Sequence, residues 1–210
     1  MTTPVILVHG TWGLKQTWWK PSSAFAAGLV ASGLGLASAE PFRWSGNLGG
    51  VEDYTPGDPE DPADDVSVDW TVEAIHLRDY ARLANVYFGR PSDAEVSLVA
   101  HSHGGQVAIL AIAHAGLNVR HLVTVATPVR KDLAGWQIGA QAAIKGSWLH
   151  LYGDWWRDSM IRLGELFDGN IGWKMKMPEA LNIYVKGRGH SDLIDPKLFK
   201  DLDIWERLKE

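Results

Sequence analysis

The chain has 210 residues, of which 46% are hydrophobic and 21% charged, a balance that suits one globular core. Its net charge is −5 and it has no basic run, which argues against nucleic acid as a partner. The sequence has no cysteine, which excludes disulfides, thiolate catalysis and thiolate metal sites.

The N-terminus leads from Met1 directly into an apolar run at residues 4–8, without the basic start and cleavage site of a secretory signal. No stretch approaches the ~18 continuous apolar residues of a membrane span. We therefore expect a cytoplasmic protein with no membrane span, although a processed secreted form would have the same sequence.

Short apolar runs alternate with longer helical patterns, which is typical of a parallel sheet with helices on both faces. The predicted strands cover residues 4–8, 35–43, 95–100, 121–126, 147–152 and 181–186. The predicted helices cover residues 21–32, 68–88, 103–115, 131–145 and 196–209. Pro21 is expected in the first turn of the first helix and Asp195 as the N-cap of the last. The fold class predicted is α/β, a three-layer α/β/α sandwich with a mostly parallel sheet of about six strands, in a single domain over residues 1–210.

Two further segments carry predictions of their own, an acidic surface loop and a short cap segment. Residues 45–67 combine glycines, prolines and acidic residues with little periodicity, which predicts a long acidic loop. One hypothesis makes this loop a docking surface for a basic partner in a larger assembly. Residues 127–146 are few for a lid, so we expect a short cap segment and a fairly open pocket.

The strongest chemical motif is Ala100-His101-Ser102-His103-Gly104, between a predicted buried strand and an apolar helix. A nucleophile elbow needs small residues two positions before and after the serine, because the strand-to-helix turn is tight. Ala100 and Gly104 meet this need, so Ser102 is the predicted nucleophile. The alternative is a glycine-rich turn with an incidental serine.

A second motif, His9-Gly10-Thr11-Trp12, ends the first predicted strand. The glycine lets the backbone turn so that the Thr11 amide faces the reaction centre. Together with the His103 amide, it would form a two-donor oxyanion hole. His9 itself is interpreted as a structural residue that binds nearby backbone.

These two motifs, with Trp44-Ser45-Gly46 and the order of the elements, resemble the α/β-hydrolase superfamily, and small bacterial esterases and lipases most closely. The resemblance spans nearly the whole chain, with Ala100 where glycine is commonest. It implies a triad in the chain order serine, acid, histidine. His190, in a glycine-rich loop after the last predicted strand, fits the base because the other histidines beyond the elbow fall within predicted helices or strands.

The triad acid is expected after the preceding strand, where Asp154 and Asp158 are both candidates. Asp154 comes first and resembles the family's acid position, so it is the preferred prediction. The alternative for either residue is a helix cap or a surface ion pair. Asp192, two residues beyond His190, is expected to brace the loop.

The resemblance implies a carboxylic ester hydrolase that needs no cofactor and no metal, acting on a small-molecule or lipid ester. A thioesterase or an amidase would use the same residues, and a non-catalytic binding protein on the same fold is a further alternative. Tryptophans near the strand ends are candidates for the substrate pocket, with core packing as the alternative. These candidates are Trp12, Trp44 and Trp155, with Trp156 beside them. The sequence makes no prediction of oligomeric state.

Overall fold

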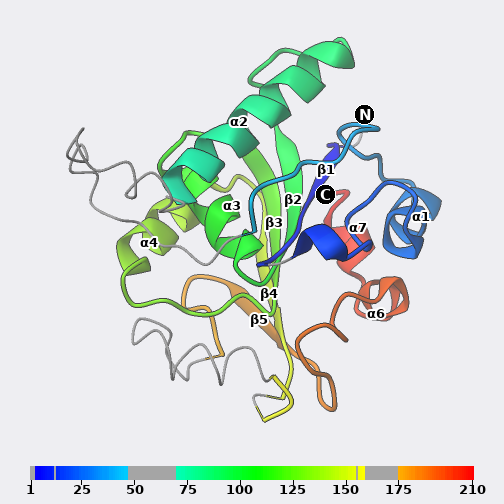
Figure 1. Ribbon diagram of the computed structural model, residues 1–210, viewed down its shortest axis with the longest axis vertical. Helices are drawn as coiled ribbons and strands as arrows, with labels where there is room; N and C mark the ends of the chain where they lie inside the picture. Colours follow the sequence, from blue (N-terminus) through cyan, green and yellow to red (C-terminus); the bar gives the residue numbers. More distant parts are fainter. Residues whose placement is uncertain (1–2, 12, 47–69, 155, 159–174) are drawn as a thin grey trace.

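The computed structural model describes residues 3–11, 13–46, 70–154, 156–158 and 175–210. At its centre is a parallel sheet of five strands that neighbour one another in chain order (Figure 1). These are β1 (Val5–Val8), β2 (Val96–His101), β3 (Val119–Val125), β4 (Trp148–Tyr152) and β5 (Leu181–Tyr184). Five of the six predicted strands are therefore confirmed, with ends displaced by two residues at most.

The strand predicted at residues 35–43 is wrong. This segment meets β1 at a single bridge, in which the Val5 amide donates to Gly35 and the Ala37 amide donates to the Val5 carbonyl, at 2.8 and 2.9 Å. Pro41 has no amide proton to continue such a ladder. The segment therefore covers part of the open edge of β1 without becoming a sixth strand.

Alternate residues of the strands pack into two separate hydrophobic clusters, which makes the fold three layers. Ile6 and Val8 face one cluster, whereas Val5 and Leu7 face the other. The first face is covered by α2 (Trp70–Tyr87), α3 (Gly104–Ala113) and α4 (Ala134–Ala143). The second is covered by α1 (Ala24–Ala31), α6 (Pro196–Asp201) and α7 (Ile204–Arg207). The predicted α/β/α sandwich is confirmed.

Local capping explains where the helices differ from expectation. Helix α1 begins after Ser23, whose Oγ accepts from the Ala26 amide at 3.0 Å, so Pro21 precedes the helix. Asp195 caps α6 as predicted, through the Lys197 amide at 2.9 Å. The single helix expected at 196–209 is divided because Asp203 has a left-handed φ of 54°.

The structure describes all of the predicted cap segment at 127–146 and little of the predicted acidic loop. Within 127–146, α4 packs on α3 through Ala140 and so belongs to a covering layer of the sheet. That the segment also caps a pocket remains a prediction. Most of the predicted acidic loop lies outside the described residues. Among the described helices, none is long and apolar enough to cross a membrane.

Candidate active site

Ser102 occupies a strained turn between β2 and α3. Its φ is 55°, in the left-handed region that a residue with a side chain seldom adopts. The Ser102 amide donates to the Val125 carbonyl at 2.8 Å, and the Ser102 carbonyl accepts from the Gly105 amide at 2.9 Å. Hydrogen bonds on both sides thus hold the conformation expected of a nucleophile elbow.

Gly104 shows why the elbow requires a small residue. A Cβ added at Gly104 would lie 2.1 Å from the carbonyl oxygen of His9. The elbow is therefore pressed against the loop that follows β1. Ala100, on the other side of the serine, is fully buried in the cluster beneath α3.

The loop after β1 also lies close to the side chain of Ser102. A Cβ added at Gly10 would lie 2.6 Å from the Ser102 Cβ and 3.2 Å from its Oγ. Thr11 Oγ1 lies 2.7 Å from His103 Nδ1, which joins this loop to the elbow by a side-chain hydrogen bond. Thr11 and His103, whose amides are the predicted oxyanion donors, are therefore neighbours in the structure.

Two tryptophans bind this loop through their indole N–H groups. The Trp44 indole donates to the His9 carbonyl at 2.7 Å, and the Trp19 indole donates to the Gly13 carbonyl at 2.9 Å. The His9 ring packs against both indoles, with centroids 4.6 Å from Trp19 and 5.5 Å from Trp44. We name Trp19 and Trp44 the indole clamp.

His9 and Trp44 both agree with a structural reading. His9 is fully buried, its Nδ1 lies 2.9 Å from the Gly10 carbonyl, and burial lowers its pKa. Trp44 is 3% exposed, which fits core packing rather than the predicted contact with substrate. Trp19 was not identified from the sequence. Trp12 and Trp155 lie outside the described residues.

His190 pairs with Asp158, not with the preferred candidate Asp154. His190 Nδ1 lies 2.9 Å from Asp158 Oδ2, and the two side chains are only 11% and 2% exposed. Because a carboxylate only accepts, Nδ1 donates and carries the proton. In the neutral imidazole, Nε2 is then the nitrogen without a proton.

Asp154 binds the loop that carries His190 instead. Its carboxylate accepts from the Gly187 amide at 3.0 Å and from the Tyr184 hydroxyl. Its carbonyl accepts from the Asp158 amide at 3.1 Å, which forms one helical turn. This turn brings Asp158, four residues later, back to His190, so the prediction of Asp154 as the partner of His190 is wrong.

The loop around His190 is fixed at further points. Asp192 Oδ2 accepts from the Gly189 amide at 3.0 Å, so the expectation that Asp192 braces the loop is confirmed. The His190 carbonyl lies 3.1 Å from Nε2 of His101, the residue just before the serine. His190 and Ser102 are thereby brought to the same edge of the sheet, at the carboxyl ends of its strands.

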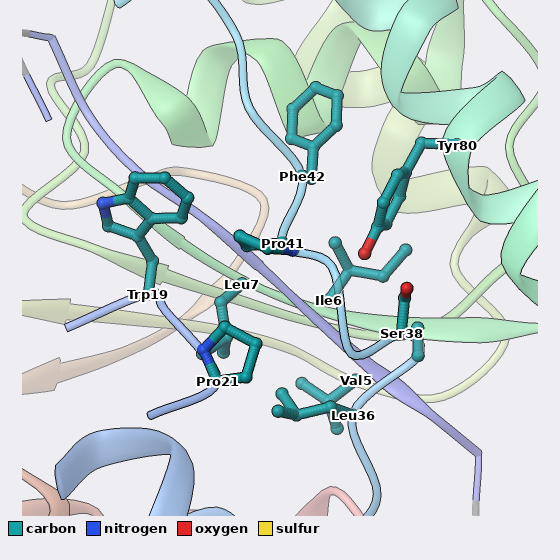
Figure 2. Close-up of a pocket in the computed structure, with 11 residues that line it drawn as sticks. Val5, Ile6, Leu7, Trp19, Pro21, Leu36, Ser38, Pro41, Phe42 and Tyr80 are labelled. Carbon is teal, nitrogen blue, oxygen red and sulfur yellow. The ribbon is translucent and has the colours of Figure 1, made fainter. Parts of the chain in front are cut away.

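A small cavity is lined by none of Thr11, Ser102, Asp158 and His190. It lies beside β1, under Pro41 and Phe42, with Trp19 and Tyr80 at its sides (Figure 2). Its volume is about 10 Å³, enough for one water molecule. In the part of the chain that the structure describes, no cluster of three or more histidine and carboxylate side chains is arranged to hold a metal ion.

Comparison with known proteins places the fold. No protein-family model matches the chain, and no curated protein sequence is significantly similar to it. Among solved structures, the mature lipase BlEst2 of Bacillus licheniformis is similar with a TM-score of 0.59 and 18% identity, over 100% of this chain and 93% of the lipase. A carboxylesterase structure from Nitrososphaera gargenis has a TM-score of 0.55 and 11% identity, over 98% and 90%. A predicted CIB-like hydrolase from Thermoplasma acidophilum has a TM-score of 0.53 and 15% identity, over 98% and 86%.

The chain has the α/β-hydrolase fold. In this α/β-hydrolase fold the elbow, the loop after β1 and the loop after β5 meet at one edge of the sheet. Identities below 20% establish the fold alone. The reaction that the chain could catalyse depends on the side chains gathered at this edge of the sheet.

Proposed function

We propose that the protein is a serine hydrolase that cleaves carboxylic esters through an acyl-enzyme. Ser102 is the nucleophile, His190 the general base and Asp158 the acid that orients the base. The observation that carries the proposal is the buried hydrogen bond between His190 Nδ1 and Asp158, on a loop whose His190 carbonyl is bound by His101, the residue just before a serine in a strained elbow. Buried titratable pairs of this kind are concentrated at functional sites.

The geometry supports a two-step reaction. His190 Nε2 takes the hydroxyl proton as Ser102 Oγ bonds to the acyl carbon, and Asp158 stabilises the resulting imidazolium. The amides of Thr11 and His103 donate to the oxyanion, aided by the N-terminus of α3. The proton then passes to the leaving alcohol as its C–O bond breaks. Water, deprotonated by His190, releases the acid and restores Ser102.

Labelling with a fluorophosphonate probe tests the nucleophile without knowledge of the substrate. We expect one adduct per chain, located at Ser102 by peptide mapping, because such probes react with an activated serine. His190→Ala is expected to abolish labelling while the variant remains folded by circular dichroism. A folded wild-type chain that takes up no probe would contradict the proposal and favour the binding-protein alternative.

The reaction class is tested with matched substrates that share one acyl group. Nitrophenyl ester, thioester and anilide derivatives of that acyl group differ only in the leaving group. We expect the ester to have the highest kcat/KM. If the thioester or the anilide were turned over preferentially, the proposed triad would stand, but the proposed substrate class would change from ester to thioester or amide.

A further inference from the structure

His101 lies between the nucleophile and the base without being either. It is the last residue of β2, so Ser102 follows it directly. Its ring is 2% exposed and its centroid lies 4.7 Å from that of His190, at an interplanar angle of 64°. Trp18 packs on the ring edge-on at 6.0 Å and helps to close it off from water.

The hydrogen bond of His101 defines its tautomer. Nε2 lies 3.1 Å from the His190 carbonyl oxygen, and a carbonyl only accepts, so Nε2 carries a proton. Nδ1 is buried and has no hydrogen-bond partner among the described residues. The ring is therefore a neutral imidazole that uses its one donor on the backbone of the base.

Neutrality matters at this position. Burial, and then the nearby charge of His190, lower the pKa of His101 to about 3. The ring consequently stays uncharged when His190 takes up the proton of the serine. A lysine or arginine would supply a donor to the same carbonyl but would repel the imidazolium that forms during the reaction.

We propose that His101 is a positioning residue that ties the backbone of the base to the strand bearing the nucleophile. The inference rests on the proposed function, since it assigns His190 as the base. Asp158 fixes the His190 ring through Nδ1, Asp192 fixes the preceding amide, and His101 fixes the carbonyl. Of these three contacts, only the one from His101 connects the base to the residue next to Ser102. Catalysis depends on the distance between His190 Nε2 and Ser102 Oγ, because proton transfer requires these two atoms to be within hydrogen-bond reach.

Two variants separate the donor from the ring. His101→Phe keeps an aromatic ring but has no donor, and His101→Gln retains an amide that can donate to the same carbonyl. We expect His101→Phe to lower kcat and the rate of fluorophosphonate labelling about tenfold, the equivalent of one ordinary hydrogen bond, with KM changed less than about twofold. His101→Gln is expected to recover most of the loss. His121→Phe, which removes a buried histidine from the neighbouring strand, serves as the control and should retain parental kcat.

Nitrogen-15 NMR of the imidazoles reports on the same contact without turnover. We expect the nitrogen shifts of His101 to be those of the neutral Nε2–H tautomer from pH 5 to 8. We also expect a downfield resonance of the His190 Nδ1 proton in the wild type and in His101→Gln, and a weaker one in His101→Phe. Failure of the wild type to label at Ser102 would refute the proposed function, while these spectra would still test the contact. Parental kcat and labelling in folded His101→Phe, or an Nδ1–H tautomer at His101, would overturn the positioning role.

Discussion

At the scale of single residues, the two aspartates after β4 have different roles although they lie one helical turn apart. Asp158 binds the imidazole, whereas Asp154 binds the loop through Gly187 and Tyr184. The sequence placed both in the right segment but favoured Asp154, whereas it is Asp158 that binds His190. The turn between them begins where the Asp154 amide donates to the Arg188 carbonyl at 2.9 Å, a contact between segments more than thirty residues apart that the sequence pattern does not predict.

The same substitution at both positions tests this division of roles. Asp158→Asn removes the carboxylate that stabilises the imidazolium, so we expect kcat to fall by on the order of 10³–10⁴. Asp154→Asn removes a brace of the loop, and we expect a fall in kcat of less than about tenfold with a lower melting temperature. Steady-state kinetics on one ester, together with thermal unfolding, measure both effects. The assignment would be reversed if Asp154→Asn had the larger effect on kcat.

At the scale of elements, strands were predictable where apolar runs are buried on both faces, as in β2, whose six residues are all buried. The segment at 35–43 has apolar residues too, but it bonds with β1 only at Val5 and then meets Pro41. The loop after β1 was predicted from Gly10. Its support by the indole clamp was not, because Trp44 is 35 residues from the carbonyl that it binds.

A substitution in the indole clamp is expected to affect in particular the loop after β1, which carries the proposed oxyanion donor Thr11. Trp44→Phe keeps an aromatic ring beside His9 but leaves the His9 carbonyl without its indole donor. We expect kcat and the affinity for a boronate transition-state analogue to fall in parallel, with little change in KM. The reason is that a displaced Thr11 amide would stabilise the oxyanion of the transition state less well and leave binding of the substrate ground state unchanged.

Trp205→Phe is the matched control for the clamp. Trp205 is as buried as Trp44, at 2% against 3%, and its indole donates to the Pro196 carbonyl at 3.3 Å on the opposite face of the sheet. It should lose stability without a parallel loss of boronate affinity. Equal effects of the two substitutions on boronate binding would show that the clamp has no specific influence on the proposed oxyanion donor Thr11.

At the scale of the whole molecule, the parallel sheet gathers residues that are far apart in the chain. Gly10, Ser102 and His190 each follow a strand, and the carboxyl ends of parallel strands share one edge. This rule makes the approximate site predictable from a strand assignment alone. Contacts such as that of His101 with the His190 carbonyl are not predictable in this way, because they depend on the path of a loop rather than on the order of strands.

Buried histidines also make the stability of the whole fold dependent on pH. Burial lowers the pKa of His150 from 6.5 to about 4, and that of His101 to about 3. Below pH 6.5 the unfolded chain therefore binds protons that the folded chain does not bind. The stability present at pH 7 is lost as the pH falls from 6.5 toward the folded-state pKa values of these two histidines. Each histidine is expected to lower the free energy of unfolding by about 2 kcal/mol between pH 7 and pH 5.

Urea unfolding at the two pH values, for the parent and for His150→Gln, isolates this effect. The glutamine does not titrate, so the fall in stability between pH 7 and pH 5 should be smaller in the variant by about 2 kcal/mol. The difference between the two pH values is the relevant quantity, because the substitution also disturbs the hydrogen bonds of His150 with Thr124 and with the Met175 carbonyl at either pH. An equal fall in parent and variant would mean that His150 is not held neutral in the folded protein.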